Sequence, residues 1–146
     1  MALWQPSRAP LGFDELWSEE IGSVNGLARL RRRLRSSLTG RPTVLHPDRE
    51  HWTERLVLVA DELTSNGLRH GGAPVTTSLS RDTGRWLVSV SDASRDVPPA
   101  PAQGRDPGLG GLGLYMVADL SQAHGWFTGA DAKTVWAVVA GDTPPG

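Results

Sequence analysis

The chain has 146 residues, with 15 lysine and arginine residues against 16 aspartate and glutamate residues, a net charge of -1. This length fits one ordinary domain, and the charge balance argues against a strongly basic nucleic-acid binder or an acidic tail. The absence of cysteine excludes disulfides, thiolate zinc sites and cysteine nucleophiles.

The opening residues lack the apolar core of a secretory signal, and no apolar run approaches the roughly 18 residues of a membrane span. We therefore expect a single cytoplasmic domain, residues 1–146, that makes no membrane contact. Its core should cover about 20–140, with flexible ends at 1–15 and 141–146.

The first predicted helix covers residues 23–38. Ser23 can cap its start and Gly40 can end it. Arginines between 29 and 35 fill its polar faces, as a solvated face or as a docking surface for an acidic protein or nucleic acid. We favour the solvated face, and a net charge of -1 with no interleaved aromatic residue argues against nucleic acid. The apolar stripe at helical spacing is Leu27, Leu30, Leu34 and Leu38.

A second helix should begin at Pro47–Asp48, with Asp48 as its N-cap, and end at Gly71–Gly72. Its apolar stripe is Trp52, Leu56, Val59 and Leu63. Two alternating strands follow, around 75–79 and 86–90, joined by a turn short enough for an antiparallel hairpin. Asp92 falls on the apolar face of the second strand, where a carboxylate is costly unless it has a partner.

A loop rich in proline and glycine, residues 94–110, leads into a third helix that should end near Gln122. A strand can begin at Trp126, and the apolar run Thr134–Val139 predicts a strand buried on both faces. This order of elements predicts an α+β fold. We expect a two-layer sandwich with helices packed on one face of a mixed, largely antiparallel sheet.

Glu62 and Asn66 are one turn apart on the second helix, beside its apolar stripe. A carboxylate can position or deprotonate a nucleophile, and an asparagine oxygen suits Mg²⁺. A solvated polar edge is the alternative. Asp92 could accept a hydrogen bond from an exocyclic amine such as that of adenine, or it could form a turn.

The glycines of 108–113 satisfy the pattern GxGxxG. They do not follow directly on a strand, as a dinucleotide-binding fingerprint would, and no lysine follows them, as in a P-loop. Glycines that open a helix still let backbone N–H groups approach an anion such as phosphate. A flexible surface loop is the alternative.

Together these segments resemble the GHKL ATP-binding domain that histidine kinases, gyrase-type ATPases and anti-sigma factor kinases share. The resemblance covers about residues 20–140. The sequence from Asp61 to Gly71 resembles the N box, and its Asn-x-x-x-His-Gly ending resembles the anti-sigma factor branch of stand-alone serine kinases. The two glycine boxes and the final strand correspond to Ser91–Ser94, Gly111–Leu114 and Lys133–Trp136.

The resemblance implies a Bergerat-type fold in which Glu62 is the general base and Asn66 holds Mg²⁺ that bridges the ATP phosphates. Asp92 would read the adenine amine, with Thr134 nearby. Residues 95–110 would form a mobile ATP lid. The remaining residues expected at the nucleotide are Arg69 and His70 at the helix end, and Gly111, Leu112 and Gly113 at the second glycine box.

The implied function is that of an anti-sigma factor with Mg-ATP-dependent protein serine/threonine kinase activity. Its partners would be a sigma factor and an antagonist protein, and it would form a homodimer. The chain departs from the family pattern at Gly67, where alanine is usual, and at Ser94, where a glycine is expected. These departures motivate the alternative of a non-catalytic ATP-binding module or a ligand-free interaction module.

Overall fold

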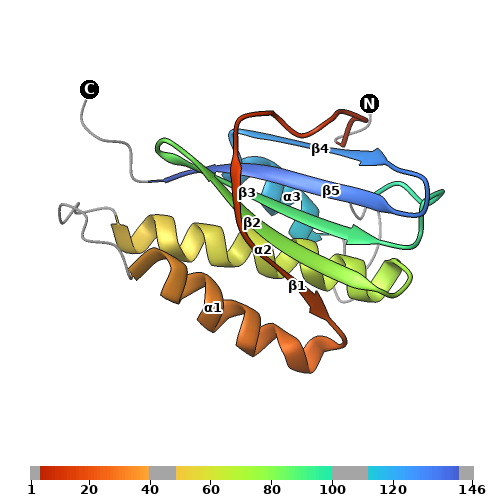
Figure 1. Cartoon of the computed structure of the whole chain (residues 1–146), viewed down its shortest axis with the longest axis horizontal. Coiled ribbons are helices and arrows are strands. Elements are labelled where there is room, and N and C mark those ends of the chain that lie inside the picture. Colours follow the sequence, from red (N-terminus) through yellow and green to blue (C-terminus); the bar gives the residue numbers. More distant parts are fainter. Residues whose placement is uncertain (1–3, 40–48, 100–111, 142–146) are drawn as a thin grey trace.

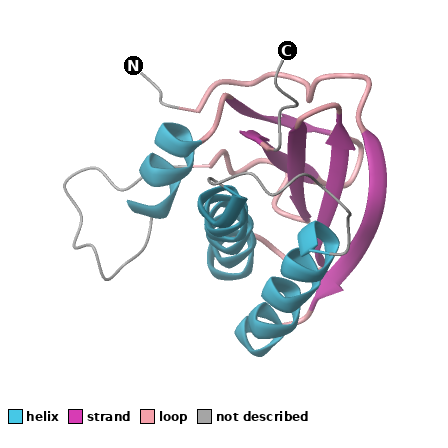
Figure 2. Cartoon of the chain, turned by 90° about the vertical axis from the view of Figure 1, so that its left-hand side faces the viewer, coloured by secondary structure: helices cyan, strands magenta, loops and turns pink. Residues whose placement is uncertain are grey.

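The computed structural model describes residues 4–39, 49–99 and 112–141. Five strands form one sheet, and three α-helices pack on one of its faces (Figures 1 and 2). No helix in these ranges is long and apolar enough to cross a membrane. The elements in chain order are β1 (Asp14–Ile21), a 3-10 turn (Val24–Gly26), α1 (Leu27–Thr39), α2 (Arg49–His70), β2 (Val75–Asp82), β3 (Arg85–Asp92), α3 (Leu112–Leu120), β4 (Ala123–Thr128) and β5 (Lys133–Ala140).

The sheet has the strand order β1-β2-β3-β5-β4, and each of the four pairings is antiparallel. The predicted α+β sandwich is therefore confirmed. The sheet was expected to be mixed, but its described strands pair only in the antiparallel sense because hairpins and crossovers bring each strand back beside its neighbour in reverse. The predicted hairpin is the pair β2 and β3, which Gly84 joins with a φ of 76°.

The two long helices form where the leucine and valine spacing predicts them. Ser23 accepts a hydrogen bond from the Asn25 N–H at 3.3 Å at the start of the first helical segment. Helix α2 ends at His70, and Gly71 follows with its N–H bonded to the Gly67 carbonyl at 2.9 Å. The expected Gly40 stop and Asp48 cap lie outside the described residues.

The main core fills the space between the helices and the sheet. Leu56, Val59 and Leu63 of α2 are almost fully buried in it, against Val88 and Val90 of β3. A second, smaller cluster covers the outer face of the sheet, around Leu87, Trp136 and Val138. Strand β5 contributes to both clusters, which confirms the expectation of a strand buried on both faces.

The segment before β1, for which flexibility was expected, makes packing contacts and hydrogen bonds from residue 4 on. Trp4 is only 3% exposed, and its ring centroid lies 4.5 Å from that of His124. The Ser7 N–H bonds to the Trp126 carbonyl at 2.8 Å, while the Trp136 indole N–H bonds to the Ser7 carbonyl at 2.9 Å. The N-terminal segment therefore packs against β4 and β5 before it enters β1 at Asp14.

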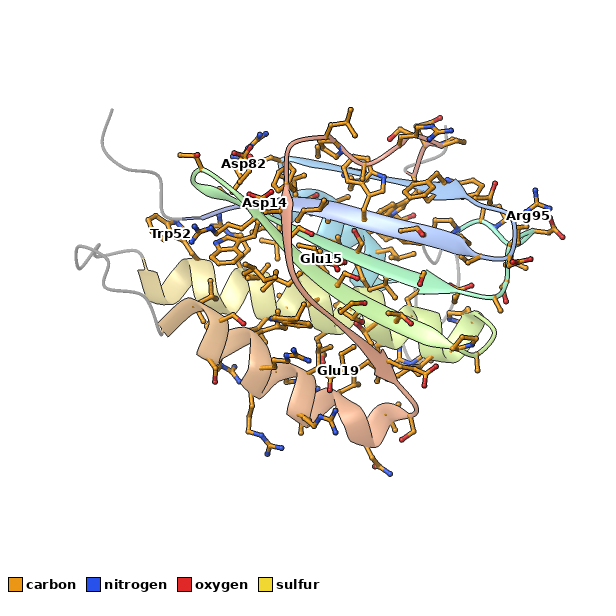
Figure 3. All side chains as sticks on the ribbon, viewed as in Figure 1. Asp14, Glu15, Glu19, Trp52, Asp82 and Arg95 are labelled. Carbon is orange, nitrogen blue, oxygen red and sulfur yellow. The ribbon has the colours of Figure 1, made fainter. Side chains whose placement is uncertain are left out.

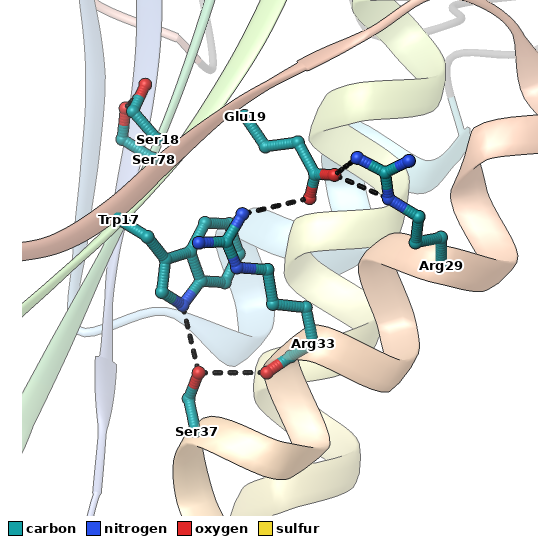
Figure 4. Close-up of polar contacts among 7 residues, drawn as sticks. All are labelled: Trp17, Ser18, Glu19, Arg29, Arg33, Ser37 and Ser78. Carbon is teal, nitrogen blue, oxygen red and sulfur yellow. Dashed lines mark hydrogen bonds and ion pairs between the residues drawn. The ribbon is translucent and has the colours of Figure 1, made fainter.

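The hydrophobic pattern of the sequence did not predict strand β1, because the buried face of this strand carries a charged residue. Glu19 is 7% exposed at a position where alternation would place an apolar residue. Arg29 and Arg33 of α1 pair with its two carboxylate oxygens, the latter at 3.5 Å (Figure 4). Burying this carboxylate is possible because two cations from a later segment compensate it.

The arginines of α1 mostly pair with carboxylates of the same chain. Arg33 also stacks over the Trp17 ring at 4.5 Å, and the Trp17 indole donates to the Ser37 hydroxyl at 2.9 Å (Figure 4). Arg31 bonds to Asp61 at 2.8 Å and Arg35 to Glu54 at 3.2 Å, both on α2. These contacts favour a structural face that joins β1, α1 and α2 over a docking surface.

Candidate functional site

Helix α2 carries the first group of candidate residues along its border with α3. It packs on β2, β3 and β5 and lies between α1 and α3. Because Val59 and Leu63 face the sheet, Glu62 and Asn66 fall at the edge of that face, one turn apart and half-buried. The structure therefore brings these two side chains to one side of the helix, as predicted.

Glu62 lies directly against the beginning of α3. A Cβ atom added at Gly113 would overlap the Glu62 carboxylate, so a side chain there would force the Glu62 side chain to move. Gly113 is the second residue of α3, where backbone N–H groups have no partner within the helix. The helix start that was predicted to receive phosphate thus adjoins the predicted base.

Burial raises the pKa of the Glu62 carboxyl above its ordinary value, and the negative charge of Asp61 raises it further. The positive charge of Arg69 acts in the opposite direction. A carboxylate with a raised pKa is a stronger base near neutral pH than an exposed glutamate. This electrostatic setting suits a group that accepts a proton.

The structure describes only some of the other residues that were expected near phosphate. Arg69 and His70 are exposed at the C-terminal end of α2. Leu112 begins α3, and Gly111 lies outside the described residues. The expected lid, 95–110, is described only up to residue 99, so its role stays a prediction.

Asp92 ends β3 and is 3% exposed. Its Oδ1 accepts a hydrogen bond from the Ser94 N–H at 2.8 Å, and its Oδ2 lies 3.5 Å from Lys133 Nζ. Gly71 packs on the same carboxyl, because a Cβ atom there would lie 2.7 Å from the Asp92 Cβ. The sequence predicted that this buried carboxylate needs a partner, and Lys133 is that partner.

Thr134 is not the direct cross-strand partner of Asp92. In the pairing of β3 with β5, Asp92 is opposite Lys133 and Ser91 is opposite Thr134. Successive strand residues face opposite sides of a sheet, so Thr134 shares the outer face with Trp136, while Lys133 shares the helix-facing side with Asp92. Thr134 is thus one register position from Asp92 with its side chain on the opposite face of the sheet, and its expected role at adenine stays a prediction.

Lys133 is the residue that sequence reasoning missed. It is 2% exposed, and its ammonium donates to the Val97 carbonyl at 2.6 Å as well as facing Asp92. The signal was available in the parity of β5: position 133 has the same parity as Val135 and Val139, which enter the main core. A lysine in that series predicts a buried charge with a partner.

Gly67, the departure from the usual alanine, is buried between α2 and the sheet. A Cβ atom there would lie 3.3 Å from the Cγ1 atoms of Val75 and Val90, closer than most contacts in protein cores. An alanine there would require Val75 or Val90 to shift, and this packing cost acts against the gain in helix propensity of about 1 kcal/mol that alanine has over glycine.

In the three described ranges, no group of three or more His, Asp or Glu side chains is arranged to hold a metal ion. Asn66 offers one amide oxygen, so a magnesium ion here would take its other ligands from phosphates and water. The phosphate end of the site fits Mg-ATP in its residue types and its close helix approach. At the other end, the acceptor intended for adenine already has partners.

Comparison with protein-family models matches residues 53–143, more than half of the chain, to the histidine kinase-, DNA gyrase B- and HSP90-like ATPases. The match covers both ends of the site, from α2 to β5. The chain belongs to this family and is a GHKL-type ATP-binding domain with the Bergerat-type arrangement of helices on one face of a sheet. No curated protein matched the sequence.

Replacement of Gly71 by alanine tests the close packing on Asp92. Gly71→Ala should lower the free energy of unfolding by about 1–3 kcal/mol, because the new methyl group overlaps the Asp92 carboxyl. The matched control is Gly72→Ala, whose Cβ would meet the Ala93 Cβ at an ordinary 3.4 Å. Urea denaturation measures both, and equal effects of the two substitutions would contradict the packing described.

Proposed function

We propose that this chain is a regulatory protein of the anti-sigma type that transfers the γ-phosphoryl group of Mg-ATP to a serine or threonine of an antagonist protein. The observation that carries the proposal is the position of Glu62. Its carboxyl has a raised pKa, lies against the start of α3 and is one turn from Asn66.

Bound ATP would supply the phosphoryl group, and Mg²⁺ would neutralise charge on its phosphates. Glu62 would hold the protein hydroxyl in position and accept its proton as the new P–O bond forms and ADP leaves. Asn66 would provide an oxygen ligand for the ion. Arg69, exposed at the end of the same helix, would add positive charge near the phosphates.

The proposed partners are a sigma factor and an antagonist protein, and the proposed assembly is a homodimer. The support is the sequence at the end of α2, where Asn66 is followed by His70 and, directly after the helix, by Gly71, in the order typical of the anti-sigma branch. Direct nucleic-acid binding is not part of the proposal, because Arg29, Arg31 and Arg35 pair with carboxylates of the chain.

A second function is favoured by the other end of the site. The Asp92 carboxylate is engaged by the Ser94 N–H and by Lys133, so its oxygens already have partners before any ligand arrives. In this alternative the domain does not transfer phosphate, and nucleotide either shapes a partner-binding surface or does not bind. Transfer and binding measured on the same variants separate the two functions.

Glu62→Gln should leave ATP binding close to that of the wild type and reduce phosphoryl transfer by about 10²-fold or more, because the proton acceptor is lost. Glu54→Gln is the matched control, since Glu54 lies exposed on the same helix. Binding is followed by the thermal shift with ATP and Mg²⁺, where ligand at 100 times Kd stabilises by about 2.7 kcal/mol. Transfer is followed with labelled ATP and a co-encoded antagonist. Equal transfer by both variants removes Glu62 from the mechanism, while binding without any transfer by the wild type supports the second function.

The pH dependence of transfer should reflect the raised pKa of Glu62. As pH falls through that pKa the carboxylate becomes protonated, so kcat/KM declines at a pH above the ordinary range of glutamate. Asp61→Asn removes a neighbouring negative charge and should move this decline to lower pH. Arg69→Gln removes a positive charge and should move it to higher pH. Shifts in the same direction for both variants would contradict the assignment.

A further inference from the structure

Lys133 and Asp92 form a buried cross-strand ion pair where β3 ends and β5 begins. Their side chains are 2% and 3% exposed, and Nζ lies 3.5 Å from Oδ2. The two residues are direct partners in the antiparallel register, on the side of the sheet that faces the helices. Removing both charges from water is costly, and each therefore depends on the other.

Each carboxylate oxygen of Asp92 has a partner within the protein. The Ser94 N–H occupies Oδ1 at 2.8 Å, and Lys133 faces Oδ2. Gly71 also packs on this carboxyl, because a Cβ atom at Gly71 would lie 2.6 Å from Asp92 Oδ2. An amine that approaches Oδ2 from the side of Lys133 would therefore take the place of the Lys133 ammonium.

The same ammonium also binds the segment after β3. It donates to the Val97 carbonyl at 2.6 Å, and the Val97 N–H bonds to the Ser94 carbonyl at 3.2 Å. Arg95 anchors the same segment through a second hydrogen bond, in which its Nε donates to the Gly129 carbonyl at 2.8 Å on the turn between β4 and β5. Figure 3 shows Arg95 at this end of the sheet. Release of Lys133 would thus loosen residues 94–97.

We propose that Lys133 is the affinity-determining residue of the base end of the site. Its ammonium and the exocyclic amine of adenine compete for Asp92, so nucleotide binds only to the fraction of molecules in which Lys133 has left Asp92 and Val97. Apparent affinity falls by that fraction. This inference rests on the proposed ATP site and adds what limits its occupancy.

The competition also couples nucleotide binding to the conformation of residues 94–97. When the amine of a bound nucleotide displaces Lys133, the Val97 carbonyl loses its donor, and the segment from Ser94 to Val97 changes its contacts. A partner protein that binds this segment in its released form would raise nucleotide affinity by the same factor by which nucleotide raises partner affinity.

The test compares the ATP affinity of the wild-type chain with that of the Lys133→Ala variant, both measured by calorimetry in the presence of Mg²⁺. Removal of the competing ammonium should tighten binding by about tenfold or more. Without nucleotide, amide hydrogen exchange at residues 94–97 should also be faster in the variant than in the wild type, because the hydrogen bond from Lys133 to the Val97 carbonyl is lost. The control is Ser89→Ala on the outer face of β3, which should change neither quantity.

Lys133→Gln keeps the test decisive if the alanine variant fails to fold by circular dichroism. It keeps a neutral donor for the Val97 carbonyl and drops the charge, so a smaller gain in affinity is expected. Equal or weaker ATP binding by the folded Lys133 variants, with binding by the wild type, would overturn the competition and leave the proposed function intact. Absence of ATP binding by the wild type and by every variant would overturn both.

Discussion

Helix α2 must bury one face against the sheet, and the arrangement of the site depends on that constraint. Leu56 and Val59 are almost fully buried in the core. The buried hydroxyls of Thr64 and Thr77, 2.8 Å apart, join the helix to β2. Because these contacts fix the rotation of the helix about its axis, Glu62 is turned toward α3 without being fully buried. Its raised pKa follows from this intermediate position.

The two ends of the site differ in what they present to a ligand. At the phosphate end, one half-buried carboxylate adjoins a helix start and a neighbouring asparagine. At the base end, Asp92 is closed by Ser94, Gly71 and Lys133. Family membership shows an ATP-binding domain, whereas the buried ion pair is a property of this chain. Under the proposed competition, a nucleotide exchanges a protein contact for a ligand contact at the Asp92 end only.

The sequence predicted the elements whose periodicity is strong and local. The stripe of α2, the hairpin around Gly84 and the run in β5 each carry their signal within about ten residues, and each is present in the structure. Strand β1 escaped prediction because Glu19 occupies a buried position that only Arg29 and Arg33, later in the chain, make tolerable.

The candidate site shows the same division between local and non-local information. Helical spacing alone places Glu62 beside Asn66, and strand parity alone places Asp92 on the apolar face. The partner of Asp92 depends on the register between β3 and β5, which a motif in one strand does not specify. A shift of one residue exchanges the two faces of a strand, and the observed register makes Lys133 the direct cross-strand partner of Asp92.

We infer that one Mg-ATP molecule spans both ends of this site, and a titration of the isotope-labelled protein with Mg-ATP, followed by backbone NMR, tests this inference. Amide signals of Gly113, Ser94 and Val97 should shift along a single saturation curve, while those of Arg32 and Arg35 on α1 should stay in place. Shifts confined to α1, or to only one end of the site, would contradict it.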